Sequence, residues 1–151
     1  MPHRGPVTEL SARGRRAVAG LPPVDKRLLN LHPPKRKNYV NHQFPQSVVV
    51  TYILLKGLVV KGVAVRMETA KMILLCVDSY IKFGYIRAIN LVCPGTNTKR
   101  AYYNIMNLAH HGNLIKVDRG IFIPSESSIE LYIYAHNEYY NLLSQPMRWR
   151  L

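Results

Sequence analysis

The feature that most constrains the fold is a helix break at Cys93-Pro94-Gly95, in the middle of residues 85–124. Proline cannot donate a hydrogen bond to a continuing helix, and glycine permits a sharp reversal, so the chain must turn here. Before the break, apolar side chains recur at helical spacing and predict a short helix over 86–92, with Ile86, Ile89 and Val92 on its apolar side. After the break, Thr96 or Asn97 is a good N-cap for a further helix, which we expect over 96–110.

The helix over 96–110 is amphipathic. Its inner face is apolar and carries Ala101, Ile105 and Leu108. Its outer face is polar and carries Thr98, Lys99, Arg100, Tyr103, Asn104 and Asn107. Side-chain amides can hydrogen-bond to adenine and guanidinium groups to guanine, so this face has the chemistry of a helix that reads base edges in a major groove. The alternative is an ordinary solvated helix face.

A β-hairpin is expected directly after this helix. Two short apolar strands, 114–117 and 121–123, flank Asp118-Arg119-Gly120, in which Gly120 can take a positive φ. Alternation places Ile115 and Val117 across from Ile121 and Ile123. Two basic residues, Lys116 and Arg119, then lie near the tip, where they would meet a phosphate backbone or a minor groove.

Residues 69–124 resemble the winged helix-turn-helix superfamily of DNA-binding domains, in the order helix, helix, helix, β-hairpin. The segments LVCPGTNTKRAYYNIMNLAHHGNLI and IKVDRGIFIP carry the resemblance. It implies a reading helix with contacts from Thr98, Lys99, Arg100, Tyr103, Asn104 and Asn107, and a wing carrying Arg119. Two features depart from the pattern: the tight proline-glycine connection and the long N-terminal addition. No family within the superfamily is assigned.

Two more helices are expected outside this unit. Residues 68–83 have a helical apolar stripe, and Gly84 supplies a C-terminal stop. Residues 125–143 form the other helix, with Ser125 or Ser127 as cap. Its tyrosine-rich surface is expected to pack on its own domain, with a homodimer or larger assembly as the alternative.

Residues 48–65 form the most apolar stretch of the chain. The β-branched content favours two short strands with a turn at Lys56-Gly57, and a buried helix from Ser47 is the alternative that periodicity does not exclude. A membrane span is disfavoured, because a charge near the centre of a spanning helix costs roughly 2.5 to 3.5 kcal/mol.

Residues 1–46 are expected to form a disordered basic tail. Seven of the ten prolines lie there and apolar residues are sparse, so the segment cannot offset its ordering entropy. Within it, Lys35, Arg36 and Lys37 form a basic cluster of nuclear-localisation type that can also contact phosphates. The expected organisation is therefore this tail, a domain over 47–144, and a short basic tail over 145–151.

The charge of the chain predicts a polyanionic partner. Lys and Arg number 21 against 8 Asp and Glu, which gives a formal net charge of +13. Nucleic acid is the leading candidate, with duplex DNA favoured and RNA as an alternative, and an anionic membrane surface is second; charge alone does not separate them. The two cysteines are expected to be reduced packing thiols, and the expected location is intracellular: cytoplasm or nucleoid, or the nucleus if the 33–37 cluster acts as a signal.

Enzyme signals are weak in this sequence. The glycines lack P-loop spacing, the carboxylates are scattered, and His110-His111 diverge on a helix, where they suit its C-terminal end rather than a metal. We therefore expect no catalytic activity, cofactor or metal. The leading hypothesis is a winged-helix DNA-binding regulator that reads the major groove with helix 96–110. The alternative is a structural component of a nucleoprotein assembly, such as a ribosomal or virion protein, that binds through its basic tail.

Overall fold

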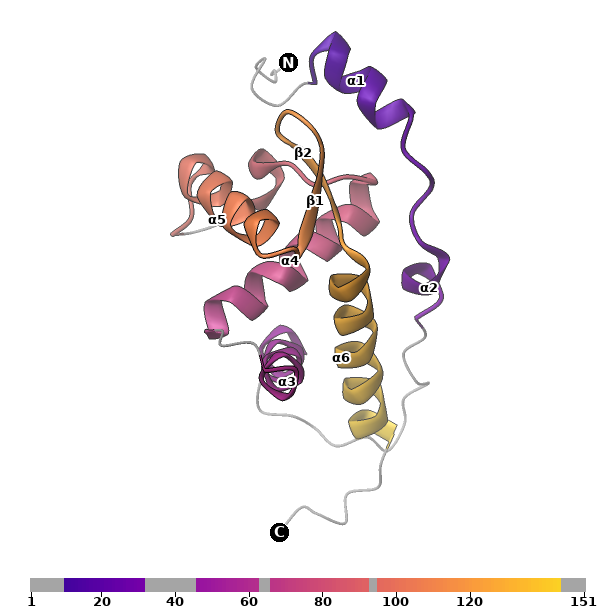
Figure 1. The fold of residues 1–151 in the computed structure, drawn as a ribbon. Coiled ribbons are helices and arrows are strands. Elements are labelled where there is room, and N and C mark those ends of the chain that lie inside the picture. Colours follow the sequence, from indigo (N-terminus) through magenta and orange to yellow (C-terminus); the bar gives the residue numbers. More distant parts are fainter. Residues whose placement is uncertain (1–9, 32–45, 63–65, 93–94, 145–151) are drawn as a thin grey trace.

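The computed structural model describes residues 10–31, 46–62, 66–92 and 95–144 (Figure 1). Within these ranges the chain forms six α-helices, a short 3₁₀ helix and one two-stranded antiparallel sheet, so the expected α+β class is confirmed. The elements are α1 Ala12–Ala19, α2 Lys26–Leu29, α3 Gln46–Val60, α4 Met67–Phe83, η2 Ala88–Leu91, α5 Thr98–His110, β1 Leu114–Asp118, β2 Ile121–Pro124 and α6 Glu126–Ser144.

The apolar stretch after residue 46 is a helix, so the prediction of two strands is wrong and the alternative of a helix is confirmed. Val50, Leu54 and Leu58 follow one another at intervals of four and are buried where α3 packs on α6 and α4. β-Propensity is a weak preference, and burial of this stripe between two helices outweighs it. Residues 63–65, the end of the expected strand region, lie outside the described residues.

Gly57 lies inside α3 rather than at a turn. A Cβ placed on it would lie 3.3 Å from Cε2 of Tyr134 and 3.4 Å from Cδ2 of Leu131, both on α6. The absence of a side chain therefore lets the two helices approach closely. Close backbone approach, rather than chain reversal, is the reason for glycine at this position.

The helices expected over 68–83 and 125–143 are confirmed as α4 and α6. Helix α4 ends at Gly84, which adopts the left-handed conformation with φ of 85°. At the start of α6 the Ser125 hydroxyl accepts a hydrogen bond from the backbone N–H of Ser128 at 3.4 Å. Helix α6 packs on α3 and α4 of its own domain, as expected for its tyrosine-rich surface.

The short helix expected over 86–92 is only a single 3₁₀ turn, η2. Ile86 is not helical: its backbone pairs with Phe122 of β2, with N–O distances of 2.7 and 3.0 Å. Ile86 is fully buried there in an extended conformation, and Ile89 lies in the 3₁₀ turn that follows. The three-residue spacing of the two isoleucines therefore does not reflect an α-helix. The pairing ties the hairpin to the segment that precedes α5.

The helix and hairpin expected after the break are confirmed. Asn97 is the N-cap of α5, and its side chain accepts a hydrogen bond from the backbone N–H of Arg100 at 2.9 Å. Strands β1 and β2 pair antiparallel with Ile115 opposite Ile123, and Gly120 has a φ of 73°. Val117 falls at a register irregularity between Lys116 and Asp118, so only part of the expected alternation is present.

The expectation of disorder through residue 46 is wrong for residues 10–31. Ser11 caps α1, and the α1 backbone at Gly14 is buried near Ile121 of the hairpin. Further along, the side chain of Leu28 is buried in the core, and the Tyr80 hydroxyl accepts a hydrogen bond from the backbone N–H of Asp25. Only Gly14 and Leu28 are buried within residues 10–31, so the sequence of this segment has no repeating apolar pattern. For this reason composition predicts a disordered tail here.

Several expectations fall outside the described residues. These are the 1–9 part of the N-terminal segment, the basic cluster Lys35, Arg36 and Lys37 within 32–45, Cys93 and Pro94 of the helix break, and the tail over 145–151. Among the helices that the structure does describe, none has both the length and the apolar character that crossing a bilayer requires.

Candidate nucleic-acid interface

The outer face of α5 is open to solvent along its length. Ala101, Ile105 and Leu108 are buried as expected, and they fix which side of the helix faces outward. Thr98, Lys99, Arg100 and Asn107 are exposed, Asn104 is half-buried, and 60% of Tyr103 is exposed. At 1.5 Å per residue the helix is about 20 Å long, which suits insertion into a major groove.

Four of the expected reading residues share one surface depression. This shallow hollow of about 490 Å³ is lined by Arg100, Tyr103, Asn104, Met106, Asn107 and His110. It offers a guanidinium, two amides and a phenol at one place on the helix surface. Hydrogen-bonding groups of these kinds are the ones that discriminate base edges.

The two basic residues of the hairpin, Lys116 and Arg119, lie apart from each other in the structure. Arg119 lies exposed at the turn of the hairpin and, together with Thr98 at the start of α5, lines a groove of about 530 Å³. Lys116 is exposed on β1 opposite Phe122 and lines neither of these hollows. The structure therefore brings Arg119 close to the first turn of α5 and leaves Lys116 apart from it.

Charge divides the described residues into two parts. The hairpin half, residues 10–24, 84–92 and 95–125, contains eight basic residues and a single acid, Asp118; the basic residues are Arg13, Arg15, Arg16, Arg87, Lys99, Arg100, Lys116 and Arg119. The helix half, residues 25–31, 46–62, 66–83 and 126–144, contains seven basic residues (Lys26, Arg27, Lys56, Lys61, Arg66, Lys71 and Lys82) and six acids (Asp25, Glu68, Asp78, Glu126, Glu130 and Glu138).

The two halves lie on either side of α4, which belongs to the helix half and crosses the middle of the molecule, where it contacts β2 and η2. In Figure 1 the hairpin tip, α1 and α5 lie at the upper end, whereas α3 and the later turns of α6 lie at the lower end. The net positive charge of the described residues is therefore concentrated around α5 and the hairpin. A surface with such an excess of positive charge attracts polyanions.

Sequence reasoning missed the basic residues that flank the hairpin. Arg13, Arg15 and Arg16 are on α1, which the sequence assigned to a tail, and Arg87 is in the segment between α4 and η2. The sequence signal that could have revealed α1 was Ser11, a good N-cap residue, followed by residues that favour a helix. This segment has no apolar stripe. The signal predicts a helix but not where that helix docks.

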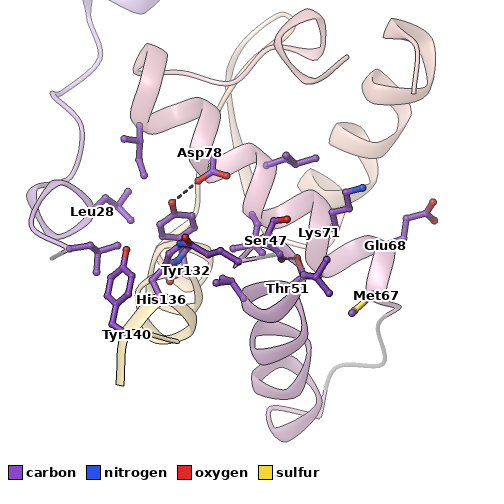
Figure 2. Close-up of a pocket in the computed structure, with 17 residues that line it drawn as sticks. Leu28, Ser47, Thr51, Met67, Glu68, Lys71, Asp78, Tyr132, His136 and Tyr140 are labelled. Atoms are coloured by element: carbon purple, nitrogen blue, oxygen red, sulfur yellow. Dashed lines mark hydrogen bonds between the residues drawn. The ribbon is translucent and has the colours of Figure 1, made fainter. Parts of the chain in front are cut away.

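A second feature of the molecule is a cavity of about 830 Å³ in the helix half (Figure 2). It lies among α2, α3, α4 and α6, and its walls combine aliphatic side chains with polar and aromatic ones. On one wall the Tyr132 hydroxyl donates a hydrogen bond to Oδ1 of Asp78 at 2.5 Å, and the His136 ring stacks on Tyr132 at 4.1 Å between centroids. Sequence reasoning missed this cluster, because Asp78 and Tyr132 are 54 residues apart.

The cavity wall perturbs the ionisation of its polar groups. Although the Asp78 side chain reaches the open cavity, its apolar surroundings raise the pKa of the carboxyl, and the hydrogen bond from Tyr132 partly offsets that rise. Burial raises the pKa of Tyr132, and the hydrogen bond to Asp78 and the Asp78 charge raise it further. Nδ1 of His136 is 3.0 Å from the carbonyl oxygen of Tyr132, which places a proton on Nδ1 and leaves Nε2 as an acceptor when the ring is neutral. The cluster joins α4 to α6.

Two other expectations concern cysteine and histidine. Burial raises the pKa of Cys76 to about 12, so this thiol stays protonated and acts as a packing group, as expected. His111 is the C-cap of α5, and its Nδ1 lies 2.8 Å from the carbonyl oxygen of Asn107, which confirms the expected placement of the histidines at a helix C-terminus. Within the described ranges, no three metal-ligating side chains are grouped together.

Comparison of the chain with models of protein families, with curated proteins and with solved structures finds no match. The functional argument for this protein therefore rests on its own residues: the exposed α5 face, the adjoining hairpin and the division of charge.

Proposed function

We propose that this protein is an intracellular nucleic-acid-binding regulator of winged-helix type, which reads the major groove of duplex DNA with α5. The observation that carries the proposal is the concentration of basic residues, with a single acid, around an exposed polar helix and its hairpin. An amphipathic helix alone favours a solvated surface. The same helix at the centre of the one strongly basic half of the described molecule favours a polyanion as partner.

The order of elements supports the winged-helix assignment. Helix α4, helix α5 and the β1–β2 hairpin follow one another in the order that the resemblance implies, with the 3₁₀ turn η2 in the place of the second helix. The pairing of Ile86 with Phe122 ties the hairpin back to the segment before η2, so the wing is held against the same core as α5. A wing fixed in this way can contact the backbone while α5 lies in the groove.

The division of roles follows from side-chain chemistry. Arg100, Asn104 and Asn107 have the groups that pair with base edges. Thr98, Lys99 and Arg119 lie around the first turn of α5, where a hydroxyl and positive charges suit phosphate oxygens. Base contacts would supply sequence preference, and phosphate contacts would supply salt-dependent affinity.

The test is binding of the purified full chain to a random duplex library and to duplexes selected from it, across a salt series. A regulator retains a preferred site and loses about 1 to 3 kcal/mol for each key base change. Binding that depends on salt but shows no preferred site would contradict the regulator. Removal of residues 1–9 is the appropriate truncation, because removal through residue 46 would also delete α1, α2 and their contacts.

A second candidate is a structural component of a nucleoprotein assembly. It is favoured by the basic residues outside the described ranges, which lie in the first 46 and the last seven residues: Arg4, Lys35, Arg36, Lys37, Arg148 and Arg150. Such a protein would bind through charge spread over several segments, without a preferred site. The same salt series separates the two candidates.

A further inference from the structure

We infer that the groove between α1, η2, the hairpin tip and the start of α5 binds a phosphodiester of the nucleic acid that α5 contacts. The inference rests on the proposed nucleic-acid function and extends it to α1, an element outside the helix-helix-helix-hairpin unit. The consequence is that α1 is a docked part of the interface and not a loose basic arm.

The groove has the lining that a phosphate needs. Its volume is about 530 Å³, and its polar lining includes Arg87, Thr98 and Arg119, contributed by three separate segments. Arg15 does not itself line the groove, but its Nη1 donates a hydrogen bond at 2.9 Å to the carbonyl of Leu10, a lining residue, which holds a further guanidinium beside the groove. Guanidinium groups bind phosphate oxygens with charge-assisted, often bidentate hydrogen bonds.

The position of α1 depends on close contact at Gly14. A Cβ on Gly14 would lie 3.2 Å from Cδ2 of Leu10 and 3.5 Å from Cδ1 of Ile121 on β2. An alanine here would need only a small shift of the Leu10 side chain, but its Cβ would already be in van der Waals contact with Ile121, so we expect a long side chain such as leucine to push α1 away from the hairpin. Glycine at this position therefore allows α1 to close one side of the groove.

The only acid of the hairpin half is neutralised by the same helix. A guanidinium nitrogen of Arg13 lies 3.2 Å from Oδ1 of Asp118, whose side chain is 15% exposed. Asp118 directly precedes Arg119, and its unpaired charge would repel a phosphate in the groove. When α1 is docked, the Arg15 guanidinium lies beside the groove and the Arg13 guanidinium compensates the negative charge of Asp118. Both effects favour an anion over a neutral ligand.

The experiment measures the salt dependence of duplex binding for the full chain and for Arg15→Ala with Arg119→Ala. Each lost phosphate contact is expected to lower the slope of log affinity against log salt by about one, so the double variant loses about two. The loss is expected to be the same on selected and random duplexes. Arg16→Ala is the matched variant on α1. Since Arg16 is two helical positions from Gly14 and points away from the hairpin, it is expected to lose less than half as much as Arg15→Ala.

Gly14→Leu tests the docking itself, because it keeps every arginine and displaces α1 from the hairpin. The expected result is a loss of slope close to that of Arg15→Ala. If Gly14→Leu retains the full slope, or if Arg16→Ala costs as much as Arg15→Ala, the arginines act as an undocked charged arm and the inference is wrong.

The outcome also separates this inference from the proposed function. If Arg15→Ala with Arg119→Ala leaves the slope unchanged while the wild-type chain binds a selected duplex, the groove is not a phosphate site and the phosphate role of Arg119 is wrong, whereas the proposed reading of DNA by α5 stands. If the wild-type chain binds no duplex at all, both are contradicted.

Discussion

The hairpin half and the helix half of this protein differ in charge balance and in how their polar side chains are paired. In the helix half, acidic and basic residues are nearly equal in number, and Asp78 and Tyr132 hydrogen-bond to each other across α4 and α6. In the hairpin half, eight basic residues face a single acid, and the polar face of α5 is left open. The comparison teaches that charges are nearly balanced in one half, whereas the other half leaves most of its positive charge open to solvent, which is the basis of the proposed contact with a polyanion.

The largest expected effect is on the helix half. Leu54 is fully buried between α3 and its neighbours, so Leu54→Ala is expected to lower the free energy of unfolding by about 2 to 5 kcal/mol. Urea unfolding measures this. Val59→Ala is the control on the same helix, since Val59 is exposed and its loss should change stability by no more than about 0.5 kcal/mol. At a temperature where Leu54→Ala remains folded, its duplex affinity should equal that of the wild type; a large loss of affinity would break the division between the halves.

The next effect is on the hairpin half. Arg100→Ala with Asn104→Ala removes two groups from the open face of α5 and should weaken binding to a selected duplex by about tenfold or more, with little change in stability. Lys56→Ala with Asn137→Ala is the matched control, because it removes one charge and one amide from exposed positions of α3 and α6. Equal affinity of the two double variants would remove α5 as the reading element.

The smallest effect concerns the cluster at the cavity. Tyr132→Phe removes the donor to Asp78 and is expected to cost about 1 kcal/mol of stability at neutral pH, with Tyr134→Phe as the exposed control on α6. The carboxyl has a pKa above its ordinary 3.8, so protonation favours the folded state, and that contribution is lost as pH rises through the folded pKa.

Tyr132→Phe raises that pKa further, because the hydrogen bond from Tyr132 lowers it. The stability difference between the variant and the wild type should therefore be largest at neutral pH, where Asp78 is ionised, and should shrink in acid. A difference that is constant from pH 7 down to pH 3 would show that Tyr132 contributes only packing.

Local sequence patterns predicted the elements that have a periodic apolar stripe, a helix-capping residue or a turn glycine. The apolar stripe of α4, the capped and amphipathic α5, and the turn at Gly120 all have a pattern that a short window contains. The outward side of α5 follows from that stripe, so the exposure of Arg100 and Asn107 was predictable before the structure.

Tertiary contacts account for what local signals missed. A uniformly apolar stretch such as α3 has no period, and its helical state is decided by packing on α6, including the close approach at Gly57. Ile86 fits a helical spacing in the sequence, but its backbone is extended and pairs with Phe122 of β2. Docking of α1 through Gly14 and the Arg13–Asp118 contact joins residues about 105 positions apart, and no local pattern encodes it.

The most direct test of the central claim is a residue-resolved binding map, in which the backbone amide signals of the ¹⁵N-labelled full chain are followed during titration with a selected duplex. The account predicts that the largest shifts fall in α5 and around the hairpin turn, with smaller ones in α1, and that α3 and the later turns of α6 stay unchanged. Shifts concentrated on α3 and α6, with α5 unaffected, would contradict the assignment of the hairpin half as the nucleic-acid interface.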